Sequence, residues 1–286
     1  MAPTPEDALR SAIVEVGRRL YARGYCASND GNISVRLDGQ RLLATPKSVS
    51  KGFMTPDMMV VTDMSGKKLA GDRDPSSELL MHLAVYRNRP DASAVVHAHP
   101  PIATGFAVAG IPLDRAVLAE VVTTLGSIPI AEYGTPSTPE LAHAVEAYIK
   151  AHDGLLLANH GALTVGHELY AAYYKMETIE HFARISLVAR LLGRERVLSR
   201  EEVDRLQRLR GTYGIASPAP ICPPDQVPAR AGTAEGNAAC QVVRAADVPP
   251  GGPRLAAAAA LGADQEIRLT YGELAALIED AIRALK

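Results

Sequence analysis

Residues 94–101 read AVVHAHPP, an apolar run that ends on two histidines and two prolines. The apolar residues predict a short buried strand, and the prolines end it because they cannot donate a ladder hydrogen bond. Side chains two positions apart in a strand point to the same face, so we expect His97 and His99 to lie side by side. The two side chains could lie on a solvated strand face, but the apolar run before them favours burial. Buried imidazoles need polar partners. A metal ion would satisfy both rings at once.

A third histidine stands in a similar place. Catalytic zinc commonly takes three protein ligands and leaves one position open. His160 directly follows the apolar segment GLLLA and precedes Gly161, so it too is expected at a strand end. We therefore expect His97, His99 and His160 to form a three-nitrogen metal site. Zn²⁺ is the expected ion, with Fe²⁺, Mn²⁺ and Co²⁺ as alternatives, because neutral imidazoles suit all of them.

Glu78 is the candidate acid or base beside this site. It opens a predicted helix just after two serines, where a glutamate often does no more than complement the helix dipole. Three polar segments could hold an anion such as phosphate, although each could also be a simple turn. Their candidate contact residues are Gly31 and Asn32 in NDGN, Lys47 and Ser48 in TPKSVSKG, and the serine pair Ser76 and Ser77.

Composition narrows the class of protein. The 286 residues carry a formal net charge of −2 with no tryptophan, which argues against a nucleic-acid partner. The apolar run LAAAAALG is far shorter than the roughly 20 residues of a membrane span, so we expect no membrane partner. The three cysteines form no CxxC pair, and the first residues, MAPTPEDALR, lack the apolar core of a signal peptide. These features predict a cytoplasmic protein.

Hydrophobic periodicity predicts alternating helices and strands up to about residue 215. Helices are expected over 5–23, 76–90, 101–110, 138–151, 168–192 and 199–210, and strand pairs around 32–46, 58–71 and 154–166. We expect residues 1–215 to form the catalytic domain and the Pro/Gly/Ala-rich residues 216–269 to be irregular. Residues 270–286 predict a docking helix, because Thr270 and Glu273 form a capping box before an apolar stripe.

Taken in order, several segments resemble the class II aldolase/adducin family over roughly residues 5–215. The matching segments are GNISVR (31–36), TPKSVSKGFMTPDMMVVTD (45–63), PSSELLMHLAVYRNRPDASAVVHAHPP (75–101), GSIPIAEYGTP (126–136) and NHGALTVG (159–166). Among the enzymes of that family, the chain is most similar to fuculose-phosphate aldolase and related deoxypentulose-phosphate aldolases. The resemblance implies an α/β fold of three layers, αβα, with a mostly antiparallel central sheet. It also implies a homotetramer with active sites at the subunit interfaces.

The resemblance assigns roles to individual residues. His97, His99 and His160 match the family's zinc ligands, and Glu78 matches its catalytic carboxylate. Tyr213, in GTYGI, matches a C-terminal tyrosine that acts as proton donor in the sugar-phosphate aldolases. The positions that match phosphate contacts are Gly31, Asn32, Ser76 and Ser77.

Three departures from the family pattern stand out. Lys47 and Ser48 replace a Thr-Gly pair that binds phosphate, so the lysine could pair with phosphate or with a substrate carboxylate. Ala116 falls where the family has a second catalytic tyrosine, and Glu120 nearby aligns with an acidic residue of related epimerases. Residues 216–286 extend past the usual end of these aldolases.

The resemblance and the residues together predict a metal-dependent aldehyde-lyase. It would cleave a small ketose 1-phosphate of the fuculose-, deoxyribulose- or methylthioribulose-phosphate type into dihydroxyacetone phosphate and an aldehyde. The expected reaction passes through a metal-stabilised enediolate, with Glu78 moving the proton at the nucleophilic carbon. The alternatives on the same three histidines are an epimerase, a decarboxylase and an Fe(II) oxygenase. A metal-free, adducin-like structural module is the non-enzymatic alternative.

Overall fold

The computed structural model describes residues 4–221, which build one sheet of eight strands in the order β4-β3-β2-β1-β5-β8-β7-β6. Every neighbouring pair is antiparallel except β6 and β7, which are parallel. The strands are β1 Asn32–Arg36, β2 Arg41–Ala44, β3 Val60–Asp63, β4 Lys68–Ala70, β5 Ala94–Ala98, β6 Ile130–Ala131, β7 Gly154–Leu157 and β8 Gly161–Gly166. The expectation of a mostly antiparallel α/β fold is confirmed.

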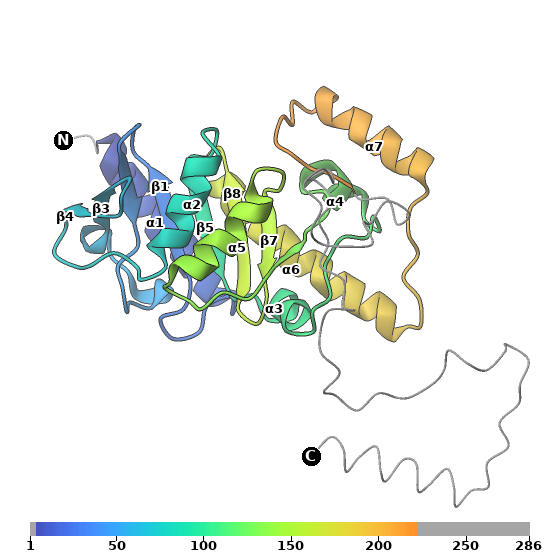
Figure 1. Cartoon of the computed structure of the whole chain (residues 1–286), viewed down its shortest axis with the longest axis horizontal. Helices are drawn as coiled ribbons and strands as arrows, with labels where there is room; N and C mark the ends of the chain where they lie inside the picture. The colour runs from blue at the N-terminus through green and yellow to red at the C-terminus, as the bar shows by residue number, and fades with distance from the viewer. Residues whose placement is uncertain (1–3, 222–286) are drawn as a thin grey trace, which may run out of the picture. The chain divides into compact units, whose positions relative to one another are not determined.

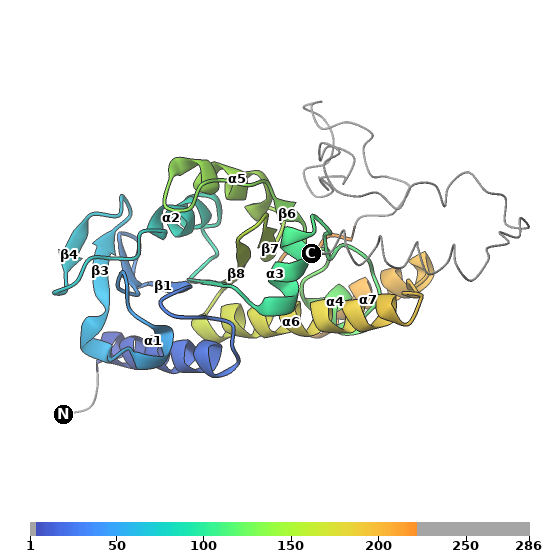
Figure 2. The same cartoon turned by 90° about the horizontal axis from the view of Figure 1, so that it is seen from below.

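Helices cover both faces of the sheet, which gives three layers (Figures 1 and 2). The helices are α1 Pro5–Ala22, α2 Leu79–Asn88, α3 Pro101–Val108, α4 Ala119–Thr124, α5 Pro139–Ile149, α6 Leu169–Leu191 and α7 Arg200–Thr212, with short 3₁₀ turns at η1 Lys51–Phe53 and η2 Pro56–Met58. The larger apolar core lies between the sheet and α1, α3 and α6, and a second core lies between the sheet and α2 and α5. Burial of both sheet faces explains why several strands read as continuous apolar runs.

Strand β5 lies near the middle of the sheet, between β1 and β8, and all five of its residues are buried. On one side, Asn32 of β1 pairs with His97 of β5. On the other side, His97 pairs with Leu163 of β8. This register fixes the end of β5 from both sides and places the turn between β7 and β8 next to it.

Local signals in the sequence account for most element boundaries. Thr138, the first residue of the predicted helix 138–151, caps α5, with its hydroxyl accepting the Glu140 N–H at 3.2 Å. The predicted strand pair around 32–46 is the β1–β2 hairpin, which turns at Asp38 because the carboxylate accepts the N–H groups of Gln40 and Arg41. The short elements α4 and β6 were not predicted, since two to six residues carry no usable periodicity.

One predicted boundary is wrong. The helix predicted over 76–90 was expected to begin at the serine pair, but α2 begins only at Leu79, with Glu78 in the N-cap position and no side-chain cap. Ser76 instead donates its N–H to the carbonyl of Thr45 at 3.1 Å, which holds it against the end of β2. Its hydroxyl accepts the N–H of Glu78 at 3.3 Å.

The predicted docking helix 270–286 and nearly all of the predicted irregular segment 216–269 lie outside the described residues. Within residues 4–221, no helix has the length and apolar character needed to cross a membrane.

Candidate metal centre

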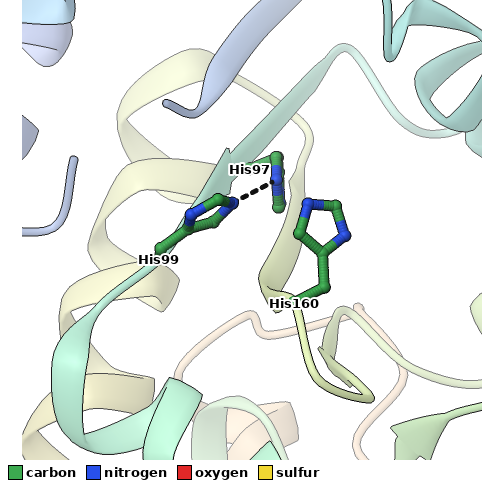
Figure 3. Close-up of side chains that lie close together, drawn as sticks. All are labelled: His97, His99 and His160. Atoms are coloured by element: carbon green, nitrogen blue, oxygen red, sulfur yellow. Dashed lines mark hydrogen bonds between the residues drawn. The ribbon is translucent and has the colours of Figure 1, made fainter. Parts of the chain in front are cut away.

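Three histidines meet where β5 ends and the β7–β8 turn passes beside it (Figure 3). His97 is the last residue but one of β5, His99 follows the strand, and His160 lies in the turn before β8. Asn159 makes this turn tight by adopting a left-handed conformation, φ +54°. The ring centroids lie 4.7 to 5.0 Å apart, and one nitrogen of each ring lies within 4.8 Å of the others.

Hydrogen bonds fix which nitrogens point inward. His97 Nδ1 lies 2.9 Å from the carbonyl of Ala162, which only accepts, so Nδ1 carries the proton and Nε2 keeps its lone pair. His99 Nδ1 likewise faces the Asp30 carboxylate at 3.5 Å. The two Nε2 atoms then face each other at 3.1 Å. Two lone pairs at this separation repel unless a shared proton or a cation lies between them.

Two of the histidines are in the protonation state that a metal requires. Burial lowers the pKa of His97 and of His99 below the ordinary value of 6.5, so both rings are neutral at neutral pH. His160 Nδ1 is buried and has no hydrogen-bond partner among the described residues. Three convergent imidazoles with nitrogens this close together fit a divalent cation.

Glu78 lies against the histidines. Its Oε1 is 3.1 Å from His160 Nε2, and its Oε2 is 3.5 Å from His97 Nε2. Oε2 also accepts a hydrogen bond from Asn32 Nδ2 at 2.7 Å. Burial by itself raises the pKa of Glu78, but the hydrogen bonds and the neighbouring histidines outweigh it and hold the pKa well below its usual range. The group is therefore a carboxylate at neutral pH, which can accept a proton.

The three candidate anion segments lie next to one another. The backbone of Thr45 bonds the carbonyl of Ile33 at 2.9 Å and receives the N–H of Ser76 at 3.1 Å, and Lys47 N–H donates to the carbonyl of Asp74 at 2.9 Å. These bonds join residues 31–33, 45–48 and 74–77. Lys47, Ser48 and Ser77 are exposed beside them.

The first of these segments depends on a glycine. Gly31 has φ +74°, and a Cβ there would lie 2.7 Å from Cys26 Sγ and 2.9 Å from the carbonyl of His97. The segment can therefore follow the end of β5 closely only because residue 31 has no side chain. Asn32 was expected as a phosphate contact, but one of its side-chain donors is already committed to Glu78.

The two other expected proton-transfer residues lie elsewhere in the chain. Glu120 is exposed in the first turn of α4, and Tyr213 is 64% exposed at the end of α7. Helices α4 and α7 pack side by side, with Ala116 buried in a small cluster with Val122 and Val203 between them (Figure 1). Within residues 4–221, no contact joins Glu120 or Tyr213 to the three histidines.

One residue near the site was missed in the sequence: Asp30 orients His99, as described above. Lys51 belongs to the candidate anion segment TPKSVSKG, but its burial, at 1% exposed, was not expected. The Lys51 ammonium donates to the carbonyls of Asn29 at 3.1 Å and of Val49 at 2.5 Å, which ties the NDGN segment to η1. A lysine in a polar loop normally lies in solvent, so nothing in the sequence signalled its burial.

Known proteins resemble this chain in the same region. The family model for the class II aldolase and adducin N-terminal domain matches residues 11–187. The 3-oxo-tetronate 4-phosphate decarboxylase of Haemophilus influenzae is 33% identical over 62% of this chain and 86% of its own. The 5-deoxy-D-ribulose 1-phosphate aldolase of Bacillus thuringiensis is 32% identical over 72% of this chain and 96% of its own.

Solved structures give the same picture. YgbL from Escherichia coli, described as a putative aldolase/epimerase/decarboxylase, superposes with a TM-score of 0.67 at 31% identity over 71% of this chain and 100% of its own. An L-fuculose 1-phosphate aldolase superposes with a TM-score of 0.66 at 31% identity over 73% of this chain and 97% of its own. The chain therefore belongs to the class II aldolase and adducin family, as an enzyme of its metal-dependent class II aldolase type.

Proposed function

We propose that this enzyme cleaves a small ketose 1-phosphate by a retro-aldol reaction, giving dihydroxyacetone phosphate and an aldehyde. The observation that carries the proposal is the position of the Glu78 carboxylate, within 3.1 to 3.5 Å of two of the three clustered imidazoles. A carboxylate at that place can move a proton at a carbon next to a carbonyl held by the same centre. Relatives that are aldolases for 5-deoxy-D-ribulose 1-phosphate and L-fuculose phosphate support the substrate class.

His97, His99 and His160 are the proposed ligands of a divalent cation, Zn²⁺ first, with Fe²⁺, Mn²⁺ and Co²⁺ as alternatives. When bound, such a cation supplies Lewis-acid polarisation of the substrate carbonyl. The hydrogen bond from His97 to Ala162 and the contact of His99 with Asp30 hold the two rings with Nε2 facing inward.

Glu78 is the proposed acid and base on the dihydroxyacetone side. When the carbon–carbon bond breaks, its electron pair stays on the carbon next to the carbonyl, and the hydroxyl of the leaving carbon gives up its proton as the aldehyde forms. Before cleavage Glu78 takes up a proton from water. It then delivers this proton to the carbon that kept the electron pair and returns to the carboxylate, while the proton of the leaving hydroxyl passes to a separate base. The Asn32 amide holds the carboxylate in place through its 2.7 Å hydrogen bond.

The leaving hydroxyl needs a separate base, and we propose that Glu120 or Tyr213 of a neighbouring subunit supplies it. Both side chains are exposed, and neither contacts the histidines of its own chain within residues 4–221. The proposed assembly is a cytoplasmic homotetramer whose active sites lie at subunit interfaces.

The substrate phosphate would bind over the joined segments beside the metal centre. Exposed hydroxyl and ammonium groups there can pair with phosphate oxygens. The proposed contacts are Gly31, Asn32, Lys47, Ser48, Ser76 and Ser77.

A second candidate function is decarboxylation of a phosphorylated 3-oxo acid. Loss of CO₂ from a carboxylate requires no base for a leaving hydroxyl, which agrees with the alanine at position 116. Lys47 is exposed beside the candidate anion segments and could pair with the substrate carboxylate. The relative from Haemophilus influenzae is named for a reaction of this kind.

One set of assays separates the candidates. The protein loaded with a single defined cation is given L-fuculose 1-phosphate or 5-deoxyribulose 1-phosphate, and dihydroxyacetone phosphate is followed by coupled NADH oxidation. In parallel, 3-oxo-tetronate 4-phosphate is tested for CO₂ release. Product in the first assay supports the aldolase, and CO₂ alone supports the second candidate. Activity retained in Glu78→Gln, or metal and activity both retained in His97→Ala, would refute the proposed site.

A further inference from the structure

From Glu78 onward along the chain, helix α2 makes a series of polar contacts with strand β1. The Asn32 amide donates to Glu78 at 2.7 Å, and one level further along, Ser34 Oγ lies 2.6 Å from His82 Nδ1. Glu78 and His82 are one helical turn apart, about 6 Å along the axis. Asn32 and Ser34 are two strand residues apart, about 6.6 Å. The two spacings match, so the two contacts lie one after the other along the same face between α2 and β1.

This series of contacts ends at Tyr86. Tyr86, one turn beyond His82, places its hydroxyl 2.9 Å from Ser34 Oγ and 2.9 Å from the Ser34 carbonyl. Ser34, His82 and Tyr86 are all buried. We call Asn32, Ser34, Glu78, His82 and Tyr86 the polar ladder. A polar chain of this kind inside a core is costly unless each group is satisfied.

Two atoms of the ladder are not satisfied by the described residues. Asn32 Oδ1 and His82 Nε2 are both buried and have no hydrogen-bond partner there. Asn32 is 3% exposed and His82 is 1% exposed, so bulk solvent does not serve them. Burial also lowers the pKa of His82 to about 4, which leaves the ring neutral.

Both atoms are acceptors. Tyr86 donates its O–H to the Ser34 carbonyl and Ser34 donates its O–H to the Tyr86 oxygen, so the proton of the neutral His82 ring lies on Nδ1 and Nε2 keeps its lone pair. Asn32 Oδ1 can only accept. A water molecule has two O–H groups, so one water between these two contacts, which are about 6 Å apart along the strand, can donate to both atoms.

We propose that His82 is a positioning residue for Glu78, acting through one bridging water on Asn32. The water donates one O–H to Asn32 Oδ1 and the other to His82 Nε2, so the amide can turn only its NH₂ toward the carboxylate. Without this contact the amide is free to flip, and its oxygen then faces the Glu78 oxygen and repels it. The inference rests on the proposed function in that Glu78 is taken as the catalytic acid and base.

Kinetics of the metal-loaded enzyme test the consequence for catalysis. His82→Leu removes the acceptor, and we expect kcat to fall about tenfold, the effect of one hydrogen bond to a charged group, with KM within about twofold. His82→Gln keeps a side-chain acceptor, its amide oxygen, and should restore most of kcat. Thr62→Val is the matched control, because it removes a buried hydroxyl on β3 that also has no hydrogen-bond partner within residues 4–221. Its kcat should equal that of the wild type.

The Asn32 side-chain amide gives a readout that does not depend on activity. Its NH₂ resonances, assigned by their loss in Asn32→Asp, should exchange slowly in the wild type and in Thr62→Val. In His82→Leu they should exchange at least about tenfold faster. Unchanged exchange in a folded His82→Leu, or an unchanged kcat, overturns the proposal. If the wild type cleaves no phosphorylated substrate, the proposed function fails, and the amide exchange still decides the role of His82.

Discussion

Gly161 is the position at which a single methyl group should damage the metal centre most directly. It opens β8 immediately after His160, and a Cβ there would lie 2.6 Å from the Ala98 carbonyl and 2.6 Å from His99 Cδ2. The same Cβ would lie 3.3 Å from His97 Cε1. Carbon atoms in contact prefer about 3.5 to 4.0 Å, so Gly161→Ala must displace the His99 ring or the end of β5 by about 1 Å.

The expected cost follows from that displacement. Overpacking a well-filled site costs about 1–3 kcal/mol of folding free energy, while a shift of about 1 Å at a reacting centre costs about 100-fold in rate. Gly154→Ala is the matched control, because Gly154 is also a buried strand glycine in the same sheet. The nearest atoms to a Cβ there would be Ile179 Cδ1 at 2.9 Å and Leu125 Cδ2 at 3.1 Å, the ends of flexible side chains.

Metal affinity, measured by competition with a chelator, and the rate of product formation are compared for the two variants. We expect Gly161→Ala to lose at least about tenfold in metal affinity and about 100-fold in kcat. Gly154→Ala should keep both values and lose only some thermal stability. Equal metal affinity and equal kcat in the two variants would show that the histidine cluster tolerates the methyl group, and the packing argument would then be wrong.

Three further variants test other parts of the fold. In urea unfolding, Gly31→Ala should lose about 1–3 kcal/mol more of the unfolding free energy than Gly24→Ala. Both glycines have φ above +70°, but only at Gly31 would an added Cβ meet neighbouring atoms. Equal losses in the two variants would refute this. The pKa of His82 is about 4 in the folded protein and 6.5 in the unfolded chain, so its contribution to the free energy of unfolding is full above pH 6.5 and is lost as the pH falls toward 4. Between pH 6.5 and 4 the wild type should therefore lose about 3 kcal/mol more of its unfolding free energy than His82→Leu. Unfolding free energies of the two proteins that change in parallel with pH would contradict this. Glu180 accepts the N–H groups of Ile102 and Ala103 at 3.1 and 2.8 Å. Glu180→Ala should therefore lower the free energy of unfolding by about 2–3 kcal/mol, and Glu180→Gln by about half as much. Unfolding curves of both variants that match the wild type would exclude a capping role.

The parts of the fold that the sequence predicted are those fixed by short-range rules. Strand alternation places His97 and His99 together, and the apolar run before His160 marks a second strand end. The hairpin at Asp38 and the cap at Thr138 follow from side chains that bond their own backbone neighbours. Each of these features depends on residues within about four positions of one another.

The remainder depends on contacts between distant segments. Asn32 reaches Glu78 because β1 pairs with β5 in a register that sets Asn32 opposite His97, and no local signal encodes that register. The burial of Lys51 likewise follows from the carbonyl of Asn29, 22 residues earlier in the chain. These tertiary contacts complete the site, which explains why its ligands were easier to predict than the residues that orient them.

The placement of the acidic and phenolic groups connects the reaction to the assembly. One chain brings together three imidazoles, Glu78 and the candidate anion segments, which is all that loss of CO₂ from a 3-oxo acid requires. A retro-aldol reaction needs one more base, for the leaving hydroxyl. Glu120 on α4 and Tyr213 at the end of α7 are exposed, and within residues 4–221 neither contacts the histidines, so in the proposed mechanism they serve the site of another copy. Aldolase activity of this chain should therefore depend on its oligomeric state, whereas decarboxylase activity should not.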